Sequence, residues 1–527
     1  MSTGYLAFVL HAHLPFIRHP EDETVMEQQW LHEAITGTYL PLVQMFEGLA
    51  QDRVHYRCTL SLSAPLITML TDDLLKVRYA EHLDKLIELS EREILRNEHE
   101  PYYRRLAEMY RDRFLSIRHT WRCHEGNLVR AFRKLQEQSG LEVITSTATH
   151  AFFPAMDRNW AAMRAQVQVA ADLYERHFGR RSPGMWLGEC GYVPGVDELL
   201  GEAGVRYFFL DTHGILFADS PPVFGAHAPL YCPSGVAAFG RDVQSSEQVW
   251  SAREGYPGDR HYRDFYRDIG FDLPLEYVAP YIHPEGHRMY TGIKYHAITH
   301  EYLHDKWVYD PDIARSRAGE HAAHFDRERG RQVQELASQM SRPPILVSPY
   351  DAELYGHWWF EGLHFLGDVF RQIHHDQDAV ETITPSDYLD RHPENQLATP
   401  AASSWGQKGY GEYWINESNA WIYRHLHVAA ERMVELARRF RGATGLRERA
   451  MKQAARELLL AESSDWAFIM SAGTTVQYAE RRTNEHVLRF TRLYEDIVRE
   501  RVDEHWLSDV ESKDNIFPDV NLAHYAS

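Results

Sequence analysis

The sequence has little cysteine, no long hydrophobic run and a shortage of positive charge. Its four cysteines, Cys58, Cys123, Cys190 and Cys232, show no CxxC spacing, which excludes a zinc knuckle and a disulfide framework. No stretch approaches the roughly 18 apolar residues that a membrane-spanning helix needs, and no basic segment precedes the short apolar run at the N-terminus. We therefore expect a soluble protein that stays in the reducing cytoplasm.

The charge balance excludes two classes of partner. Fifty-six Lys and Arg residues against 76 Asp and Glu give a net charge of −20, which would repel nucleic-acid phosphates and anionic lipid headgroups. We expect neither a nucleic-acid partner nor a membrane partner. At 527 residues the chain is also too long for one ordinary domain, so two or three domains are predicted.

Aromatic residues, in contrast, are abundant. The chain has 13 Trp, 29 Tyr and 23 Phe, many of them in polar segments that contain glycine. Such side chains can stack on the flat C–H faces of sugar rings, although they also serve ordinary cores. The stretch from Trp405 to Trp414 has too many glycines for a helix. It indicates either the wall of a groove or a packing seam between two domains, and the two interpretations are compatible.

Three short apolar runs each end in polar side chains. The polar residues that follow the runs are His11 and His13, then Glu189, and finally Asp351 and Glu353. Each run has the length and composition of a buried parallel strand, and in barrel enzymes the residues just past the strand ends reach the active site. Further strand candidates alternate with helical segments, which favours an α/β fold built on a parallel barrel.

The chain divides by composition into three parts. The segment 65–138 has helical spacing and almost no glycine, so it is predicted to be a helical insertion. We assign segments 1–64 and 139–400 to the barrel, and 401–527 to a C-terminal helical domain that contributes to a groove. Within the barrel, the stretch from about Asp219 to Arg288 lacks periodicity and is predicted to be a long loop with at most one short helix.

The carboxylates at strand ends suggest acid and nucleophile chemistry. Two carboxyl groups roughly 5–5.5 Å apart can cleave a glycosidic bond with retention, one attacking the anomeric carbon and the other protonating the leaving oxygen. Glu189 is a candidate because Trp186 and Tyr192 flank it, and because glycines on both sides permit tight backbone. Asp351 and Glu353 compete for the second role, since both would point to the same face of a strand.

The histidines allow more than one interpretation. His11 and His13, with His150, His213 and Asp351 at other strand ends, could hold a divalent metal in a hydrolase or deacetylase. They could equally donate hydrogen bonds to sugar hydroxyls, or bind one another and the backbone as ordinary buried histidines. The residues by themselves leave these alternatives open.

Longer motifs show a resemblance to a known family. The chain resembles glycoside hydrolase family 57 over nearly its whole length and, within that family, the 1,4-α-glucan branching-enzyme subgroup. The matching stretches are HAHLP from His11, the segment from Leu141 to His150, WLGECGY from Trp186, and SPYDAELYGHWW from Ser348. The segment from Trp405 to Trp421 and the helical tail are similar to the extension of the branching-enzyme subgroup.

The resemblance implies a role for each matching residue. It implies a distorted (β/α)7 barrel, with Glu189 as nucleophile and Asp351, rather than Glu353, as general acid and base. It also implies that no metal or cofactor is needed, so that His11, His13 and His150 bind sugar hydroxyls. Further glucan contacts implied by the subgroup are Arg253, Gly270, Trp405, Asp465 and Thr474.

The expected activity is retaining transfer, in which an α-1,4 glucan is cut and the released chain is joined to an acceptor glucan through an α-1,6 linkage. Tyr231, in the segment predicted to be irregular, is expected to act as a lid that keeps water out. The alternatives are a 4-α-glucanotransferase or α-amylase of the same family, a metal-dependent deacetylase, and a glucan-binding protein without catalysis. Donor and acceptor glucans are the expected partners, and we expect a monomer or small homo-oligomer.

Overall fold

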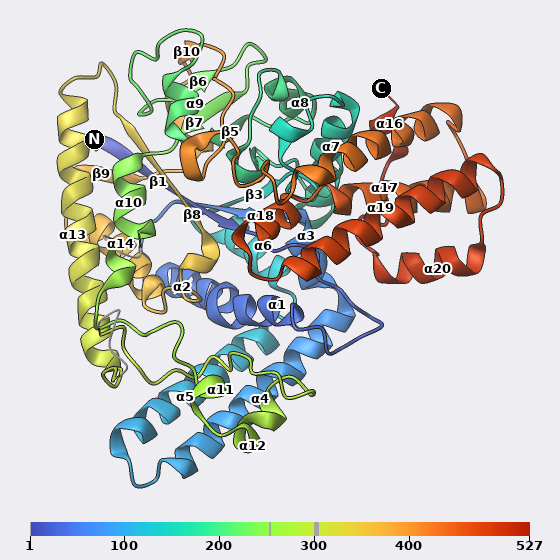
Figure 1. The fold of residues 1–527 in the computed structure, drawn as a ribbon. Helices are drawn as coiled ribbons and strands as arrows, with labels where there is room; N and C mark the ends of the chain where they lie inside the picture. Colours follow the sequence, from blue (N-terminus) through green and yellow to red (C-terminus); the bar gives the residue numbers. More distant parts are fainter. Residues whose placement is uncertain (1, 252–254, 300–304, 527) are drawn as a thin grey trace.

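The computed structural model describes residues 2–251, 255–299 and 305–526, and its centre is a curled sheet of mostly parallel strands (Figure 1). The order across the described sheet is β10-β6-β7-β5-β4-β3-β2-β1-β8, with β9 also paired to β1. All pairs are parallel except β6 with β7. The strands are β1 (Gly4–Ala12), β2 (Cys58–Leu62), β3 (Leu141–Ser146), β4 (Gly184–Trp186), β5 (Tyr207–Leu210), β6 (Leu230–Tyr231), β7 (Ala237–Gly240), β8 (Ile345–Asp351), β9 (Val380–Thr382) and β10 (Gln396–Leu397). The predicted α/β class with a distorted barrel is confirmed.

Strand β1 shows why these apolar runs become strands. All nine of its residues are buried. Leu6 and Phe8 pack into one hydrophobic cluster, whereas Tyr5 and Val9 pack into another, so both faces of the strand are covered. A strand buried on both faces needs apolar residues at consecutive positions rather than at alternate ones. The same reason explains the continuous apolar run of β8.

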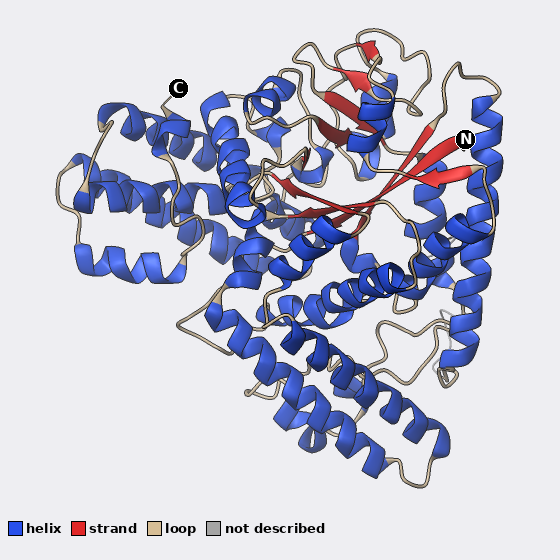
Figure 2. Cartoon of the chain, turned by 180° about the vertical axis from the view of Figure 1, so that it is seen from behind, coloured by secondary structure: helices blue, strands red, loops and turns tan. Residues whose placement is uncertain are grey.

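Helices surround the sheet, and two helical regions extend from it (Figure 2). Around the sheet lie α1 (Gln28–Ala34), η1 (Ile35–Tyr39), α2 (Leu40–Gln51), α3 (Ala64–Thr71), α6 (Leu128–Gln138), α7 (Trp160–Phe178), α8 (Val196–Glu202), α13 (Pro311–Ala337) and α14 (Gly362–His375). Helices α4 (Asp73–Arg96) and α5 (Pro101–Cys123) form the first extension, between β2 and β3 (Figure 1). The Asp72 side chain caps α4 by accepting a hydrogen bond from the Leu75 amide, and Pro101 begins α5.

The second extension is the C-terminal helical region. It contains α16 (Tyr423–Arg439), α17 (Gly445–Ala461), α18 (Ser464–Ala472), α19 (Val476–Val498) and α20 (Glu504–Lys513). One cluster of buried apolar side chains runs from the strands into both helical extensions. The proposed domain limits therefore stay predictions. No helix in the described part of the chain is both long and apolar enough to cross a membrane.

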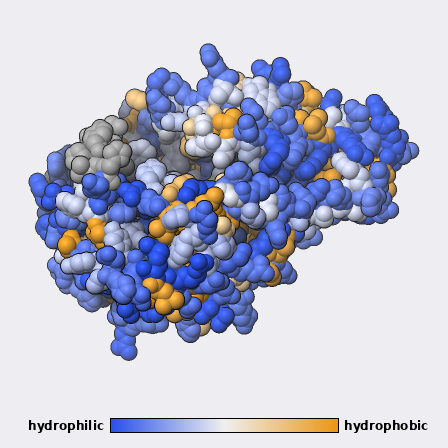
Figure 3. Space-filling model, turned by 60° about the horizontal axis from the view of Figure 1, so that its bottom comes forward, coloured by the Kyte–Doolittle hydropathy of each residue, from blue (hydrophilic) through white to orange (hydrophobic). Residues whose placement is uncertain are grey.

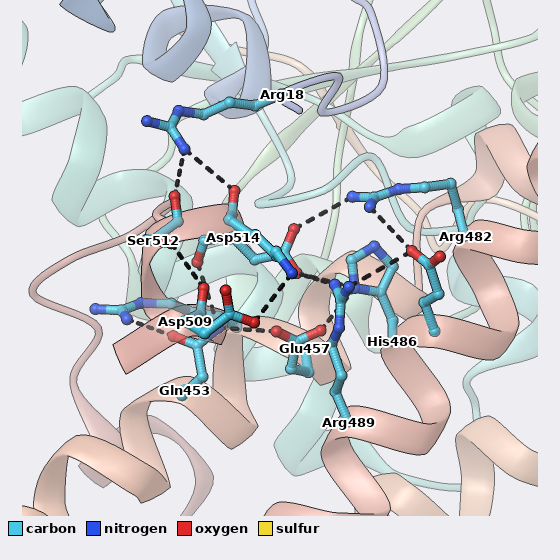
Figure 4. A network of polar contacts seen from close by, with 12 residues as sticks. Arg18, Gln453, Glu457, Arg482, His486, Arg489, Asp509, Ser512 and Asp514 are labelled. Atoms are coloured by element: carbon cyan, nitrogen blue, oxygen red, sulfur yellow. Dashed lines mark hydrogen bonds and ion pairs between the residues drawn. The ribbon is translucent and has the colours of Figure 1, made fainter. Parts of the chain in front are cut away.

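A buried polar network joins the C-terminal helices (Figure 4). Nδ1 of His486, on α19, lies 2.7 Å from a carboxylate oxygen of Glu457, on α17. Asp514, just after α20, accepts hydrogen bonds from Arg482 at 3.2 Å and Arg489 at 2.5 Å. Buried charges are tolerated when they are paired in this way, and the network fixes the relative positions of three helices.

The prediction of a long irregular segment from Asp219 to Arg288 is wrong in part. Strands β6 and β7 lie within it, and β7 pairs with β5 as part of the sheet. Helix α10 (Val243–Trp250) follows, and then two helical turns, α11 (Ile269–Asp272) and α12 (Leu275–Val278). The strands are too short, and β7 too poor in large apolar residues, to give a periodic signal.

The surface is mostly polar, as the high content of charged residues predicts. The face seen in Figure 3 is mostly hydrophilic, with hydrophobic residues in small scattered groups. Several large aromatic side chains are nevertheless exposed, including Tyr266, Trp358 and Tyr410. Trp358, which is 53% exposed, lies seven residues after Asp351 and stacks on Phe265 at 4.4 Å between ring centroids.

Candidate active site

The register of the parallel strands brings polar residues into one row. His11, near the end of β1, lies opposite Ser61 of β2 on one side and opposite Asp351 of β8 on the other. The C-terminal ends of parallel strands meet at the same edge of a sheet, and ligands bind there in open α/β sheets and in barrels. This edge carries the candidate site.

Glu189 occupies an unusual backbone conformation. It follows β4 in the short turn Gly188–Cys190, and its φ of 59° and ψ of 25° are left-handed. A residue with a side chain adopts this conformation at a cost of order 1 kcal/mol, and such strain is common in functional sites. The neighbouring glycine has a structural reason as well: a Cβ at Gly188 would lie 2.6 Å from the His150 carbonyl oxygen.

Two distant segments hold Glu189 in place. Trp405 donates its indole N–H to Oε2 of Glu189 at 2.8 Å, and its backbone N–H to the Glu189 carbonyl at 2.9 Å. Ser464, the first residue of α18, donates its hydroxyl to Oε1 at 2.8 Å. Ala151 and Ser463 form an antiparallel bridge that positions the start of α18 beside the barrel. Both carboxylate oxygens therefore have a donor.

The histidines form a chain of hydrogen bonds that ends at Ser464. Nδ1 of His11 lies 3.1 Å from the Ser61 hydroxyl, and its Nε2 lies 3.0 Å from Nε2 of His150. Nδ1 of His150 lies 2.9 Å from the Ser464 hydroxyl. With Ser464 donating to Glu189, we infer that each link donates toward Glu189. Both imidazoles are then neutral, in agreement with burial, which holds the pKa of His11 and of His150 well below its usual range.

His13 stands beside this chain and pairs with a carboxylate. Its Nε2 lies 3.0 Å from Asp465, and its Nδ1 lies 2.9 Å from the Ser63 hydroxyl. Ser463 also donates to Asp465, at 2.5 Å. Burial opposes protonation of His13, but Asp465 outweighs it and raises the pKa of the imidazole. The start of α18 thus supplies hydrogen-bond partners to two histidines of the site.

Asp351 and Glu353 have different surroundings. The expectation that they share one strand face is wrong, because β8 ends at Asp351 and Glu353 lies in the following 3₁₀ turn. Glu353 is buried and accepts hydrogen bonds from the Tyr39 hydroxyl at 2.5 Å and from the His13 amide at 3.3 Å. The Asp351 side chain is exposed to solvent and makes no side-chain hydrogen bond to any described residue, so it is accessible to a substrate.

The pKa values of Glu189, Asp351 and Glu353 are all raised toward neutral pH. Burial raises the pKa of Glu189 and of Glu353 to about 7, although Trp405, Ser464 and Tyr39 stabilise the ionised forms. The surrounding protein limits hydration of Asp351 despite its exposure and raises its pKa to about 6. The His13 imidazole lowers the pKa of each of them. Groups near their pKa at neutral pH can exchange protons with a substrate.

All six ring nitrogens of His11, His13 and His150 are engaged in the contacts described above. Of the described residues, the trio is not among the clusters whose ligand atoms converge on one point. His213, another candidate ligand, binds the Gly409 carbonyl at 2.8 Å. The ring nitrogens of the three histidines are thus occupied by hydrogen bonds to protein groups, three of them to serine hydroxyls.

The two ends of the aromatic stretch from Trp405 to Trp414 make different contacts, and its role as the wall of a groove stays a prediction. Trp405 contacts Glu189, whereas Trp414 is 2% exposed and stacks on Phe152 at 5.2 Å between ring centroids. Trp414 belongs to a hydrophobic cluster that joins the barrel loop to the C-terminal helices. One end of the stretch lines the site, and the other forms the seam.

Not all predicted residues gather at this edge. Gly270, in α11, is buried beside Met289 and Thr291, and Thr474 is exposed just after α18. Arg253 lies outside the described residues. Tyr231 is not in an irregular loop but in β6, where it packs with Trp405 against the hydrophobic cluster that contains Trp186. Its pairing with β7 and β10 fixes its backbone on both sides.

Sequence reasoning missed three contributors. Ser61 could have been found, since parallel pairing places it opposite His11. Ser464 was interpretable only as a helix cap, although no side-chain capping bond forms at the start of α18. Tyr39 lies in a π-helical turn, which is rare and frequently found at functional sites, but its sequence carries no signal for that turn.

Comparison with known proteins gives two family matches. The model of glycosyl hydrolase family 57 matches residues 7–401, and the model of the C-terminal region of 1,4-alpha-glucan branching enzymes matches residues 425–525. The first match covers the strands, Glu189 and Asp351. The second covers α17 to α20, including Ser464 and Asp465.

Individual relatives are similar over the whole chain. The 1,4-alpha-glucan branching enzyme of Thermococcus kodakarensis is 34% identical, over 99% of this chain and 79% of its own length. The structure of the alpha-amylase AmyC from Thermotoga maritima has a TM-score of 0.94 and 44% identity, with 99% of both chains covered. The branching enzyme of Pyrococcus horikoshii has a TM-score of 0.89 and 31% identity, covering 100% of this chain and 97% of its own.

Proposed function

Since the chain belongs to glycosyl hydrolase family 57, we propose that it is a 1,4-α-glucan branching enzyme in which Glu189 is the nucleophile and Asp351 the general acid and base. The observation that carries the proposal is the pair of donors on Glu189. One of them, Ser464, comes from the region that matches the branching-enzyme C-terminal model. The part of the chain characteristic of branching enzymes thus holds the catalytic carboxylate.

The reaction proceeds in two displacements. Glu189 attacks the anomeric carbon of a glucose unit in an α-1,4 chain, and Asp351 gives its proton to the departing glycosidic oxygen. A glycosyl ester on Glu189 results. Asp351, now ionised, takes the proton from the 6-hydroxyl of an acceptor glucan, whose oxygen attacks the ester. The new linkage is α-1,6 and Glu189 is released.

The surroundings of each carboxyl group support these roles. Trp405 and Ser464 hold Glu189 with one oxygen each, so that little conformational freedom is lost when the attack occurs. Asp351 is exposed to solvent, which lets leaving and attacking hydroxyl groups reach it. The raised pKa of about 6 keeps a fraction of Asp351 protonated near neutral pH.

The glucan contacts are also part of the proposal. His11, His13 and His150, together with Trp405 and Asp465, surround Glu189 and can exchange their present hydrogen bonds for bonds to sugar hydroxyls. Gly270, Thr474 and Arg253 would contact more distant units of a long glucan. Tyr231, which like Trp405 packs against the hydrophobic cluster that contains Trp186, would shield the glycosyl ester from water.

A second candidate function is α-amylase activity, because the AmyC structure is 44% identical to this chain. The first displacement would be the same, and water would replace the acceptor hydroxyl in the second. The two activities therefore differ in the acceptor and not in the carboxyl pair. Only the products distinguish them.

The decisive experiment is incubation of the pure protein with amylose, followed by proton NMR of α-1,6 linkages and a reducing-end assay. Branching produces new α-1,6 linkages in excess of new reducing ends, whereas an amylase produces reducing ends alone. Glu189→Gln and Asp351→Asn should lose turnover but still bind amylose. Glu412→Gln, which changes an exposed glutamate near Trp405, is the control and should stay active. Reducing ends without α-1,6 linkages would overturn the branching assignment.

We further propose a cytoplasmic location and a monomeric or small homo-oligomeric state, supported by the charge and cysteine content of the chain. Cell fractionation and light scattering test these two statements. Recovery of the native protein in the medium, or a large assembly in solution, would contradict them.

A further inference from the structure

A small cavity lies apart from the catalytic edge of the sheet. Its volume is about 60 Å³, and it is enclosed by α1 and η1, by the hairpin of α4 and α5, and by residues 263–294 and 356–360. Neither Glu189 nor Asp351 lines it, nor do the three histidines of the site. Its walls carry positive charge, from Arg113, Arg263 and Lys294.

Two arginines face this cavity with few partners. Arg113 and Arg263 both stack on the Phe360 ring, with guanidinium carbons 4.8 and 4.0 Å from the ring centroid. Arg113 makes one long hydrogen bond, 3.4 Å to the Gly37 carbonyl, and Arg263 makes one of 3.5 Å to the Tyr110 hydroxyl. A guanidinium has five N–H donors, so most of these ten have no acceptor among the residues that the structure describes.

Arg263 is the more deeply buried of the two arginines. It is only 8% exposed, and its Nε is buried and has no hydrogen-bond partner among the described residues. Among the residues that the structure describes, no carboxylate forms an ion pair with the guanidinium of Arg263 or of Arg113, and the Glu361 carboxylate binds only the backbone amide of Arg263. Buried arginine is ordinarily paired, since an isolated charge away from water costs several kcal/mol. These two arginines therefore lack the counterion that burial requires.

The nearby acidic groups do not supply it. Burial raises the pKa of Glu33 to about 7, and Glu33 lies 3.8 Å from His357. Burial also raises the pKa of Glu361, although the charge of Arg263 acts in the opposite direction; Glu361 accepts a hydrogen bond from the backbone amide of Arg263 and not from its guanidinium. Asp268 is 3.9 Å from Lys294 and accepts hydrogen bonds from the backbone amides of Thr291 and Gly292.

Electrostatics within the cavity agree with an unfilled positive site. Burial lowers the pKa of Arg113 to about 10, and repulsion from Arg263 acts in the same direction. Two like charges held on one aromatic ring repel each other unless an anion lies between them. Phe360 fixes both guanidinium planes in advance, which reduces the entropy lost when a ligand binds.

We propose that this cavity is a binding site for a phosphate-sized oxyanion, held by the guanidinium groups of Arg113 and Arg263. The volume of 60 Å³ corresponds to about four to six water positions at roughly 10–15 Å³ each. Phosphate has five heavy atoms and acceptor oxygens that match the fork of a guanidinium. A neutral sugar of the proposed glucan substrate would leave both positive charges uncompensated.

The ligand has two possible sources, inorganic phosphate and the phosphoryl group of a sugar phosphate. The chemistry recognised is the same for both. The enclosed volume accommodates the phosphoryl group alone, so the sugar of a sugar phosphate would have to extend through the open side. The site is independent of the proposed branching activity, because it needs only the two arginines.

Isothermal titration calorimetry with inorganic phosphate at constant ionic strength tests the proposal. We expect saturable binding of one phosphate per chain, and binding at least about ten-fold weaker in Arg113→Gln and in Arg263→Gln, since each variant loses a charge-assisted contact. Arg118→Gln is the matched control. Arg118 lies on the same helix, pairs with Asp84 on the outside, and should bind phosphate as the parent does. A parallel titration with glucose 1-phosphate identifies the source by which ligand binds more tightly.

Melting temperatures measured with and without phosphate test the same proposal even if a variant is less stable than the parent. Phosphate should raise the melting temperature of the parent and of Arg118→Gln, but not that of the two cavity variants. Without phosphate, the cavity variants should melt at or above the temperature of the parent, because an unpaired charge has been removed. Absence of saturable binding to the parent, or unchanged binding in both cavity variants, would overturn the proposal.

Discussion

The hydroxyl of Ser464 donates a hydrogen bond to Oε1 of Glu189 at 2.8 Å, across 275 positions of sequence. The donor begins α18 in the C-terminal helical region, and the acceptor follows β4 in the barrel. The same hydroxyl lies 2.9 Å from Nδ1 of His150, which connects it to His11 and Ser61. The orientation of the proposed nucleophile thus depends on both parts of the chain.

Ser464→Ala should lower kcat by roughly 10- to 100-fold, because Glu189 loses a donor of the charge-assisted kind. KM for amylose should change little, since the hydroxyl acts on Glu189 rather than on the chain. Initial rates of α-1,4 cleavage measure both constants. Ser464→Thr keeps the hydroxyl and should recover most of the rate. A full rate in the alanine variant would contradict the positioning role.

Trp405→Phe should shift the pH dependence of kcat/KM. In the parent we expect a bell-shaped pH profile of kcat/KM, with apparent pKa values near 6 and 7. These two values belong to the carboxyl pair rather than to one residue. The active form has Glu189 ionised and Asp351 protonated, and the pKa of Glu189 is the higher of the two, so the basic limb of the profile follows the pKa of Glu189. Without the indole donor that pKa rises, so the basic limb should move upward by roughly one unit and the maximum of kcat/KM should fall.

Trp414→Phe is the matched control for that experiment. Its indole N–H is buried without a partner, and its ring packs on Phe152 away from Glu189. The pH profile of kcat/KM for Trp414→Phe should have its acidic and basic limbs at the same pH values as the parent, even if the variant is less stable. Identical profiles for Trp405→Phe and the parent would mean that the indole does not stabilise the ionised carboxylate.

Tyr231→Ala should lower the ratio of new α-1,6 linkages to new reducing ends. The side chain packs against the cluster that includes Trp186, against which Trp405 also packs, and we expect its loss to admit water near the glycosyl ester. Tyr231→Phe should retain the ratio, because the ring rather than the hydroxyl excludes water. NMR and reducing-end assays on the same samples give the ratio. An unchanged ratio in the alanine variant would assign acceptor choice to other residues.

Glu462→Gln should change how stability depends on pH. Burial raises the pKa of Glu462 to about 8, above the ordinary value of 4.5. A carboxyl with a raised folded-state pKa favours folding in its protonated form, so the parent loses stability as the pH rises from about 4.5 to 8. The glutamine variant lacks this loss and should gain roughly 3–5 kcal/mol over the parent at pH 9, relative to their difference at pH 4.

Urea denaturation of both proteins at the two pH values measures that difference. Gln166 donates to Glu462 at 2.8 Å and can donate equally to the amide oxygen of the variant. Glu431→Gln, at an exposed position of α16, should follow the parent at both pH values. An equal loss of stability in parent and Glu462→Gln would show that Glu462 is not buried in its protonated form.

The strand-end rule predicted the core of the site because its physical basis is local. An apolar run followed by His11 or by Asp351 needs only parallel pairing to put both at one edge, and β1 and β8 pair with these two residues opposite each other. The prediction of Glu189 was likewise local, because it rested on the aromatic residues and glycines that flank this residue in the sequence. The family resemblance added the choice of Asp351 over Glu353, which periodicity left open.

The remaining features depend on contacts that no local pattern encodes. Ser464 resembles an ordinary helix cap until α18 is placed against the barrel, and Trp414 resembles Trp405 until one is seen to be buried. Strands β6 and β7 have two and four residues and gain stability only from their neighbours in the sheet. The lid expected at Tyr231 depended on that missing assignment. Long-range packing decides each of these cases.

The contact between Ser464 and Glu189 also orders events in time. A ribosome makes the chain from its N-terminus at roughly 5–20 residues per second, so Glu189 is synthesised tens of seconds before its donor. During that interval the nascent barrel has its carboxylates but not the hydroxyl that orients one of them. The full set of donors on Glu189 is therefore assembled only after the last helices have emerged and α18 has docked on the barrel.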